Sequence, residues 1–259
     1  MIPLSVLLHR DQDVLAEAAA ARLVTRIVDA QAARGSASVV LTGGGVGTAV
    51  LSALYASGAR DAIDWGRVDV WWGDERFLPT GDPERNETGA RAALLDHVPV
   101  DPARVHPMPA PDGPDGDDPD AAAERYAAEL RAEARPEDGE QVPAFDVLML
   151  GVGPDAHVAS LFPGTPALRD ERPVVAVRDA PKPPPTRISL TFPSLQAAEE
   201  VWVLAAGESK AEAVRLGLTE PTPDRAPVAG ARGRRGTLFL LDSAAAARLP
   251  HGAGGLSAP

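Results

Sequence analysis

The sequence predicts a single α/β domain in which a mostly parallel, twisted sheet carries helices on both faces. Short runs of β-branched residues alternate with stretches rich in alanine, glutamate and arginine, which is typical of a chain that alternates strand and helix. The chain has 259 residues, 44% of them hydrophobic, which is enough for one large core but short for two ordinary domains. We expect residues 1–249 to form this domain and residues 250–259, rich in glycine, alanine and proline, to form a flexible tail.

The N-terminal half begins with a helix expected over residues 11–33, with Asp11 or Asp13 near its cap. Residues 38–41 have the composition of a buried strand, which ends in three glycines and leads into a helix over 48–55. The next expected elements are a strand over 68–72, a helix over 84–97 and a short extended piece over 105–108. Residues 109–120 are mainly proline, glycine and aspartate, so they form a solvated loop.

The C-terminal half returns to helix over residues 121–134 and then to the least ambiguous strand of the chain, 145–150. A short buried helix is expected over 159–162. The remaining strands are expected over 174–177, 187–192, 201–205 and 237–241, with a helix over 209–216.

Composition excludes several classes of function. The net charge of −12 argues against nucleic-acid binding, which needs a basic face. The absence of cysteine excludes disulfides, thiolate-bound zinc and a cysteine nucleophile. No apolar run reaches the roughly 18 residues of a membrane span, and the N-terminus lacks the pattern of a signal peptide. We therefore expect a cytoplasmic protein, a monomer or weak homo-oligomer, that has no membrane partner.

Ligands of an open parallel sheet bind beyond the carboxyl ends of its strands. The first segment expected there contains Gly43, Gly44, Gly45 and Thr48, between a strand and a helix. Backbone N–H groups at such a turn can hold a phosphate. The glycine spacing fits neither a dinucleotide fingerprint nor a nucleotide P-loop. A tight turn without a ligand would explain the same residues.

A second polar segment follows the strand over residues 68–72. Arg76 can stabilise negative charge on a carbonyl oxygen, while Asp74 orients a neighbouring group. Glu75 between them has the simpler interpretation of a structural residue. Asn86, taken alone, is better explained as a helix cap than as a ligand. A surface ion-pair cluster is the alternative interpretation of this segment.

The third segment carries His157, which lies in a glycine-rich break after the strand over residues 145–150. An imidazole titrates near neutral pH and can take a proton from water. Asp155 stands two residues before it, where it can support the base. A histidine packed under a loop is the alternative. No second ligand stands at metal-binding spacing, so we expect neither a metal nor a cofactor.

Two cations complete the candidate site. A rigid run of three prolines leads to Arg187, and Lys210 is expected in the first turn of a helix. A lysine is unfavourable at that end of a helix dipole, which is easier to explain if an anion lies near it. Two unrelated surface cations are the alternative.

These segments, in this order, resemble the 6-phosphogluconolactonase family of the pentose phosphate pathway over about residues 9–247. The most specific stretch is Gly151-x-Gly-Pro-Asp-x-His157-x-Ala-Ser-Leu-Phe-Pro163. The family shares its modified Rossmann-like fold with glucosamine-6-phosphate deaminase/isomerase. The resemblance implies hydrolysis of 6-phospho-D-glucono-1,5-lactone to 6-phosphogluconate without metal or cofactor.

The resemblance also assigns roles to the candidate residues. His157 is implied as the general base on water, with Asp155, Arg76 and Asp74 in the catalytic pocket. The glycine-rich first loop, Arg187 and Lys210 are implied as the phosphate subsite. Asn86 corresponds to an asparagine that faces the pocket in the family.

The chain departs from the family pattern beside the proposed base. Ala156 and Val158 replace a glycine and a threonine, and the first loop lacks the commoner Gly-Gly-Ser-Thr-Pro. We expect Ala156 to be tolerated if its φ is negative and to be costly otherwise.

Three rival functions remain open at this point. The first is an amino-sugar-phosphate isomerase/deaminase, although no second acid pairs with His157. The second is a non-catalytic sugar-phosphate-binding protein on the same fold. A dinucleotide-binding oxidoreductase, which the glycine spacing disfavours, is the third.

Overall fold

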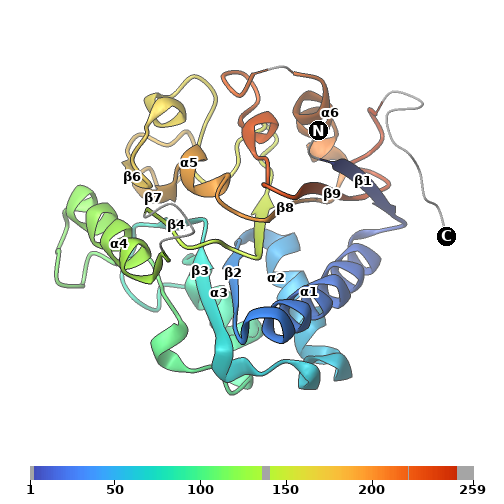
Figure 1. Cartoon of the computed structure of the whole chain (residues 1–259). Helices are drawn as coiled ribbons and strands as arrows, with labels where there is room; N and C mark the ends of the chain where they lie inside the picture. The colour runs from blue at the N-terminus through green and yellow to red at the C-terminus, as the bar shows by residue number, and fades with distance from the viewer. Residues whose placement is uncertain (1–2, 136–140, 221, 250–259) are drawn as a thin grey trace.

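The computed structural model describes residues 3–135, 141–220 and 222–249. Its centre is a parallel sheet of six strands in the order β1-β9-β8-β5-β2-β3 (Figure 1). The strands are β1 (Leu4–His9), β2 (Ala37–Leu41), β3 (Val68–Trp72), β5 (Val147–Gly151), β8 (Glu200–Ala205) and β9 (Gly236–Asp242). In β5 the residues before Gly151 are all buried, as expected for a strand covered on both faces.

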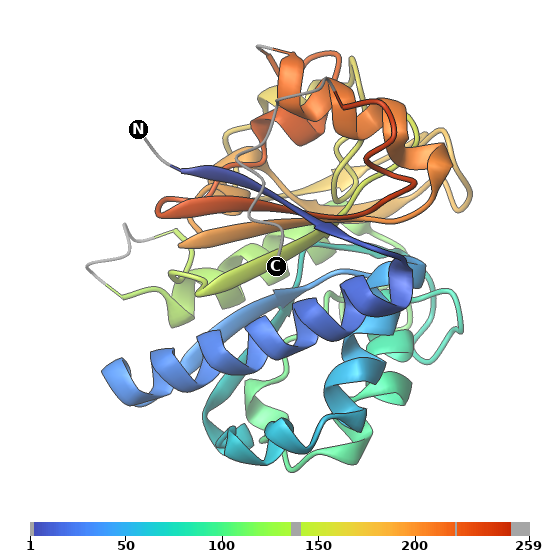
Figure 2. The ribbon, with the colours of Figure 1, turned by 90° about the vertical axis from the view of Figure 1, so that its right-hand side faces the viewer.

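Helices cover both faces of this sheet. Figure 2 shows the sheet between the N-terminal helices, blue to cyan, and the orange helical segments of the C-terminal half. The helices are α1 (Gln12–Arg34), α2 (Gly44–Ala56), α3 (Asn86–Ala93), α4 (Pro119–Glu133), α5 (Phe192–Leu195) and α6 (Ala211–Thr219). Asp11 caps α1 by accepting a hydrogen bond from Val14 N at 2.9 Å, which confirms one of the two expected caps. Among the described residues, no helix is long and apolar enough to span a bilayer.

A second, antiparallel sheet lies beyond the carboxyl edge of the main sheet. Its order is β4-β7-β6, formed by β4 (Asp74–Arg76), β7 (Arg187–Leu190) and β6 (Val174–Val177). Gly73 alone separates β3 from β4, so the chain passes directly from one sheet to the other. One cluster of buried hydrophobic side chains extends from Val6 to Ala245 and joins most of the elements.

The order of the strands in the main sheet determines where a ligand site is expected. From β2 the sheet continues through β3 in one direction, and from β5 through β8, β9 and β1 in the other. The chain therefore turns to opposite sides of the sheet after the adjacent strands β2 and β5. The loops that follow these two strands lie where open α/β sheets bind ligands. Thr42 and Gly151 connect them, since Gly151 N donates to Thr42 Oγ1 at 3.1 Å.

Several expectations need correction. The N-terminal strand β1 was not predicted; it forms an edge strand beside β9, a pairing of residues more than 200 positions apart. The expected helix over 159–162 is instead a series of turns, since Val158 makes isolated bridges to Val152 and Leu161. Arg187 opens a strand of the second sheet and not of the parallel sheet. The flexible tail expected over residues 250–259 stays a prediction, because these residues lie outside the described ones.

Candidate functional site

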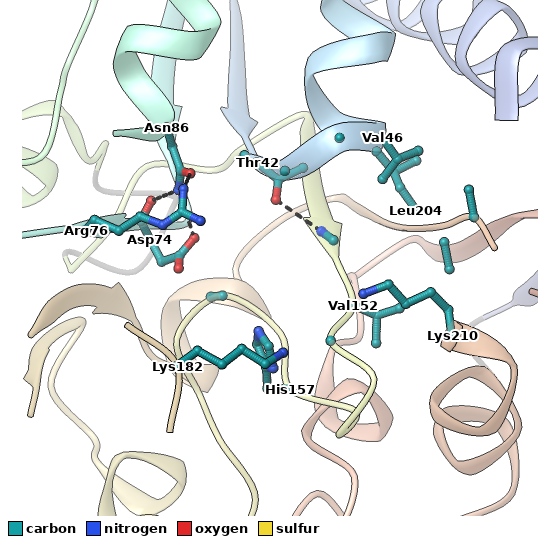
Figure 3. Close-up of a pocket in the computed structure, with 18 of the residues that line it drawn as sticks. Thr42, Val46, Asp74, Arg76, Asn86, Val152, His157, Lys182, Leu204 and Lys210 are labelled. Carbon is teal, nitrogen blue, oxygen red and sulfur yellow. Dashed lines mark hydrogen bonds between the residues drawn. The ribbon is translucent and has the colours of Figure 1, made fainter. Parts of the chain in front are cut away.

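The candidate site is a pocket of about 440 Å³ at the carboxyl edge of β2 and β5. It brings together segments that lie far apart in the sequence, as Figure 3 shows. The residues that were expected in the site and that line this pocket are Gly43, Gly44, Gly45, Asp74, Arg76, Asn86, His157, Arg187 and Lys210.

The loop after β2 forms one wall of the pocket. α2 begins at Gly44, four residues earlier than expected, and its N-cap Gly43 provides no side-chain cap. The first N–H groups of α2 are therefore available to an anion. Gly43 must lack a side chain for a different reason, because an added Cβ would lie 1.8 Å from Asn86 Oδ1.

Asp74, Arg76 and Asn86 form a hydrogen-bonded group at one side of the pocket (Figure 3). Arg76 Nη1 donates to Asn86 Oδ1 at 2.9 Å and to the Glu84 carbonyl at 2.7 Å. Asn86 Nδ2 donates to the Asp74 carbonyl at 2.8 Å and to its carboxylate at 3.3 Å. Asn86 begins α3, but its side chain orients Arg76 and does not cap the helix.

Glu75, between Asp74 and Arg76, points away from the pocket and acts as a buried anchor for α3. Its carboxylate accepts backbone hydrogen bonds from Asn86 at 2.7 Å, Glu87 at 2.9 Å and Arg76 at 2.8 Å. Burial raises the pKa of Glu75 to about 7, although Arg85 and these three N–H donors favour the charged form. The expected structural role of Glu75 agrees with these contacts.

His157 faces the pocket from the loop after β5. Its Nδ1 lies 2.5 Å from Asp155 Oδ1, and Lys182 Nζ lies 3.7 Å from the same oxygen. Burial raises the pKa of Asp155, but the hydrogen bond and charge of His157, with Lys182, lower it to about 2. Asp155 is therefore ionised at neutral pH. An added Cβ at Gly153 would lie 2.0 Å from His157 Nδ1, so the pair packs directly over this glycine.

The cations lie around His157. Figure 3 shows Lys210 across the pocket from the Asp74–Arg76–Asn86 group, with His157 and Lys182 between them in this view. Burial, followed by the nearby charge of Lys182, lowers the pKa of Lys210. Arg187 is buried and donates to the carbonyls of residues 182–184, each at 3.2 Å, so it also fixes the proline-rich segment.

Some expected positions differ in detail. Thr48 lines an adjoining cavity of about 180 Å³ and not the main pocket. Asp155 does not line the pocket; it contacts His157, which does. Lys210 lies in a 3-10 turn, Glu208–Lys210, immediately before α6 and not in its first turn.

Sequence reasoning missed Lys182, Thr42 and Gln12, which line the pocket. Lys182 had a detectable signal, because it stands inside the same proline-rich run that leads to Arg187. Gln12 had no detectable signal in the sequence. It begins α1, and the strand β1 that brings this end of α1 to the site was not predicted.

The two departures beside His157 have different consequences. Ala156 has a φ of +67°, which is the condition under which its methyl group was expected to be costly. Val158 is fully buried in the hydrophobic core and does not line the pocket. Its hydroxyl-free side chain therefore leaves the polar wall of the pocket unchanged.

Within the described part of the chain, no three His, Asp or Glu side chains are grouped in a way that would hold a metal ion. Among the residues that the structure describes, His157 is the only histidine that lines the pocket. The charged groups described at the site thus include an imidazole–carboxylate pair, an arginine–asparagine–aspartate group and further cations.

Comparison with known proteins gives concordant matches. A model of the family described as glucosamine-6-phosphate isomerases/6-phosphogluconolactonase matches residues 10–240. The chain is 64% identical over 247 residues to 6-phosphogluconolactonase of Streptomyces coelicolor, covering 95% of both proteins. It is 51% identical to that of Mycobacterium tuberculosis, covering 95% of this chain and 98% of the relative.

Solved structures agree in fold. The 6-phosphogluconolactonase of Trypanosoma brucei superposes with a TM-score of 0.80 at 27% identity, covering 96% of this chain and all of that one. A monomeric glucosamine-6-phosphate deaminase superposes with a TM-score of 0.76 at 20% identity, covering 94% and 99%, and shares the fold alone.

Proposed function

Because the chain belongs to the glucosamine-6-phosphate isomerase/6-phosphogluconolactonase family, we propose that it hydrolyses 6-phospho-D-glucono-1,5-lactone to 6-phospho-D-gluconate. This is the lactone-opening step of the oxidative pentose phosphate pathway. The observation that carries the proposal is that His157, whose Nδ1 lies 2.5 Å from Asp155 Oδ1, shares a pocket with Arg76 and Lys210. A base, an arginine and further cations are what a water attack on a phosphorylated ester needs.

In this mechanism His157 is the general base. The ionised Asp155 accepts a hydrogen bond from Nδ1–H, which leaves Nε2 as the basic nitrogen and stabilises the imidazolium that forms. Water loses a proton to Nε2 while its oxygen bonds to the lactone carbonyl carbon, C1. Arg76, held by Asn86, or nearby backbone N–H groups, stabilise the resulting oxyanion.

Collapse of the tetrahedral intermediate completes the reaction. The bond between C1 and the ring oxygen breaks, and the ring oxygen takes the proton back from the imidazolium. The product is an open-chain acid that ionises at neutral pH. His157 is neutral again, so no cofactor is consumed and the atoms balance.

The phosphate is held at the cationic part of the pocket. We assign this role to the glycine loop Gly43–Gly45, Arg187 and Lys210, to which the structure adds Lys182 as a further lining cation. The charge of Lys182 lowers the pKa of Lys210, and a phosphate bound beside the two lysines would offset this repulsion.

A pH-stat assay on freshly made lactone, corrected for spontaneous opening, tests the activity. We expect rapid acid release by the parent protein. Ammonia release from glucosamine 6-phosphate would instead identify a deaminase, and product binding without turnover would identify a non-catalytic binding protein.

The role of His157 has its own test. General base catalysis contributes about 10²–10⁴-fold, so His157→Ala should lower kcat by that factor while product binding, measured by calorimetry, largely survives. His97→Ala is the matched control, because His97 is an exposed histidine outside the pocket. Equal kcat values for His157→Ala and the parent would remove His157 from the mechanism.

We also propose that this reaction takes place in the cytoplasm, with the protein as a monomer or weak homo-oligomer. A phosphorylated lactone is charged and does not cross a bilayer unaided, so the enzyme must share a compartment with the source of its substrate. Cell fractionation and light scattering of the purified chain test these two points.

A further inference from the structure

Ser160 joins the loop that carries His157 to the second sheet. It is fully buried, three residues after His157. Its Oγ donates to Asp74 Oδ2 at 2.7 Å, and its backbone N donates to Ser189 Oγ at 3.1 Å. Through one residue the loop after β5 is therefore attached to both β4 and β7.

The contact with Asp74 extends to Arg76. Asp74 uses its other carboxylate oxygen, Oδ1, together with its carbonyl, to hold the amide of Asn86. The amide oxygen of Asn86 then accepts from Arg76 Nη1 at 2.9 Å. A continuous chain of hydrogen bonds thus leads from Ser160 to the guanidinium in the pocket.

We propose that Ser160 is a positioning residue that fixes Arg76 relative to His157 by holding the carboxylate of Asp74. The inference rests on the proposed lactonase function. Asp74 is buried, and Ser160 Oγ donates to the carboxylate oxygen that the Asn86 amide does not hold. Without the Ser160 hydroxyl, only the Asn86 amide holds this carboxylate, so the carboxylate, the amide and Arg76 can shift together. Arg76, which binds the oxyanion, is then no longer fixed in position relative to the base His157.

The first test compares Ser160→Ala with Ser194→Ala. Ser194 is an equally buried serine whose Oγ donates at 2.7 Å to the Pro173 carbonyl, and it does not line the pocket. Both variants delete one buried hydroxyl, so we expect similar losses of thermal stability. Only Ser160→Ala should lower kcat/KM, by about tenfold or more and mainly through kcat, because misplaced catalytic groups slow the chemical step.

A double-mutant cycle tests whether Ser160 acts through Asp74. In an Asp74→Ala background, Ser160→Ala should cause no further loss of kcat/KM, because the acceptor is already absent. Independent, additive losses would overturn the proposal, as would a Ser160→Ala enzyme as active as Ser194→Ala.

Two further outcomes are distinguishable. If Ser160→Ala does not fold, Ser160→Cys takes its place: its thiol is only a weak donor, so we expect a smaller loss of kcat/KM in the same direction, and activity equal to the parent's would overturn the proposal. A parent protein without lactone turnover overturns the proposed function itself, and the role of Ser160 falls with it.

Discussion

Ala156 occupies a backbone conformation that favours glycine, directly beside the proposed base. Its φ is +67° and its methyl group is fully buried. A left-handed conformation costs a non-glycine residue about 1–2 kcal/mol. Burial of the methyl group recovers about 0.8 kcal/mol, and alanine also loses less backbone entropy on folding than glycine. The opposing contributions are of similar size, which explains how alanine is accommodated here.

Ala156→Gly should therefore change the free energy of unfolding by less than about 1 kcal/mol. The matched control is Ala127→Gly, at a buried position inside α4, where loss of the methyl group and poor helix propensity add to about 2 kcal/mol. Urea unfolding of both variants checks this. A loss as large for Ala156→Gly as for Ala127→Gly would show that its backbone is not strained.

At the scale of elements, the pocket depends on how the β2–α2 turn packs against the start of α3. Gly43 lies where a Cβ would overlap the Asn86 side chain, and that side chain is held by Asp74 and Arg76. Glu75 fixes the backbone at the same point by accepting from Asn86 N and Glu87 N. The glycine is thus required by packing, whereas its φ of −83° suits any residue.

Gly43→Ala should displace the Asn86 amide and release Arg76. The hydrogen bond lost involves a charged group, worth about 1.5–3 kcal/mol, so kcat/KM should fall about 10–100-fold. Gly58→Ala is the control, because an added Cβ there meets no atom within 4 Å. Steady-state kinetics with the lactone measures both. Unchanged activity in Gly43→Ala would mean that Asn86 does not orient Arg76.

At the scale of the whole molecule, a buried histidine ties the edge of the main sheet to α4. His106 Nδ1 lies 2.6 Å from Glu129 Oε1, and its Nε2 lies 3.8 Å from Asp69 Oδ1. Its ring stacks on Trp71 with centroids 3.8 Å apart. Burial lowers the pKa of His106, but the two carboxylates outweigh burial and raise it to about 9.

A pKa raised on folding makes stability depend on pH. The contribution of His106 is fully present below its unfolded pKa of about 6.5 and is lost as pH rises to about 9. The parent should lose about 1–2 kcal/mol relative to His106→Gln across this window, less than the full shift because Glu129 is partly exposed. Urea unfolding at pH 6.5 and 9 measures it, with His97→Gln as the control. A parent-to-variant difference that is constant with pH would contradict the prediction.

The sequence by itself determined the features that depend on local patterns. Runs of buried residues predict the central strands, and the polar breaks after β2, β3 and β5 indicate where the site lies. His157 stands in the most specific of these breaks, and the family assignment followed from the same segments.

Only the tertiary structure decided the features that depend on long-range pairing. The edge strand β1 is defined by β9 at the other end of the chain, and no local periodicity reveals such a partner. The second sheet, the entry of Lys182 into the pocket and the link from Ser160 to Asp74 arise in the same way. Residue types specify which groups can do chemistry, but the distances between them are set by contacts among segments that the sequence keeps apart.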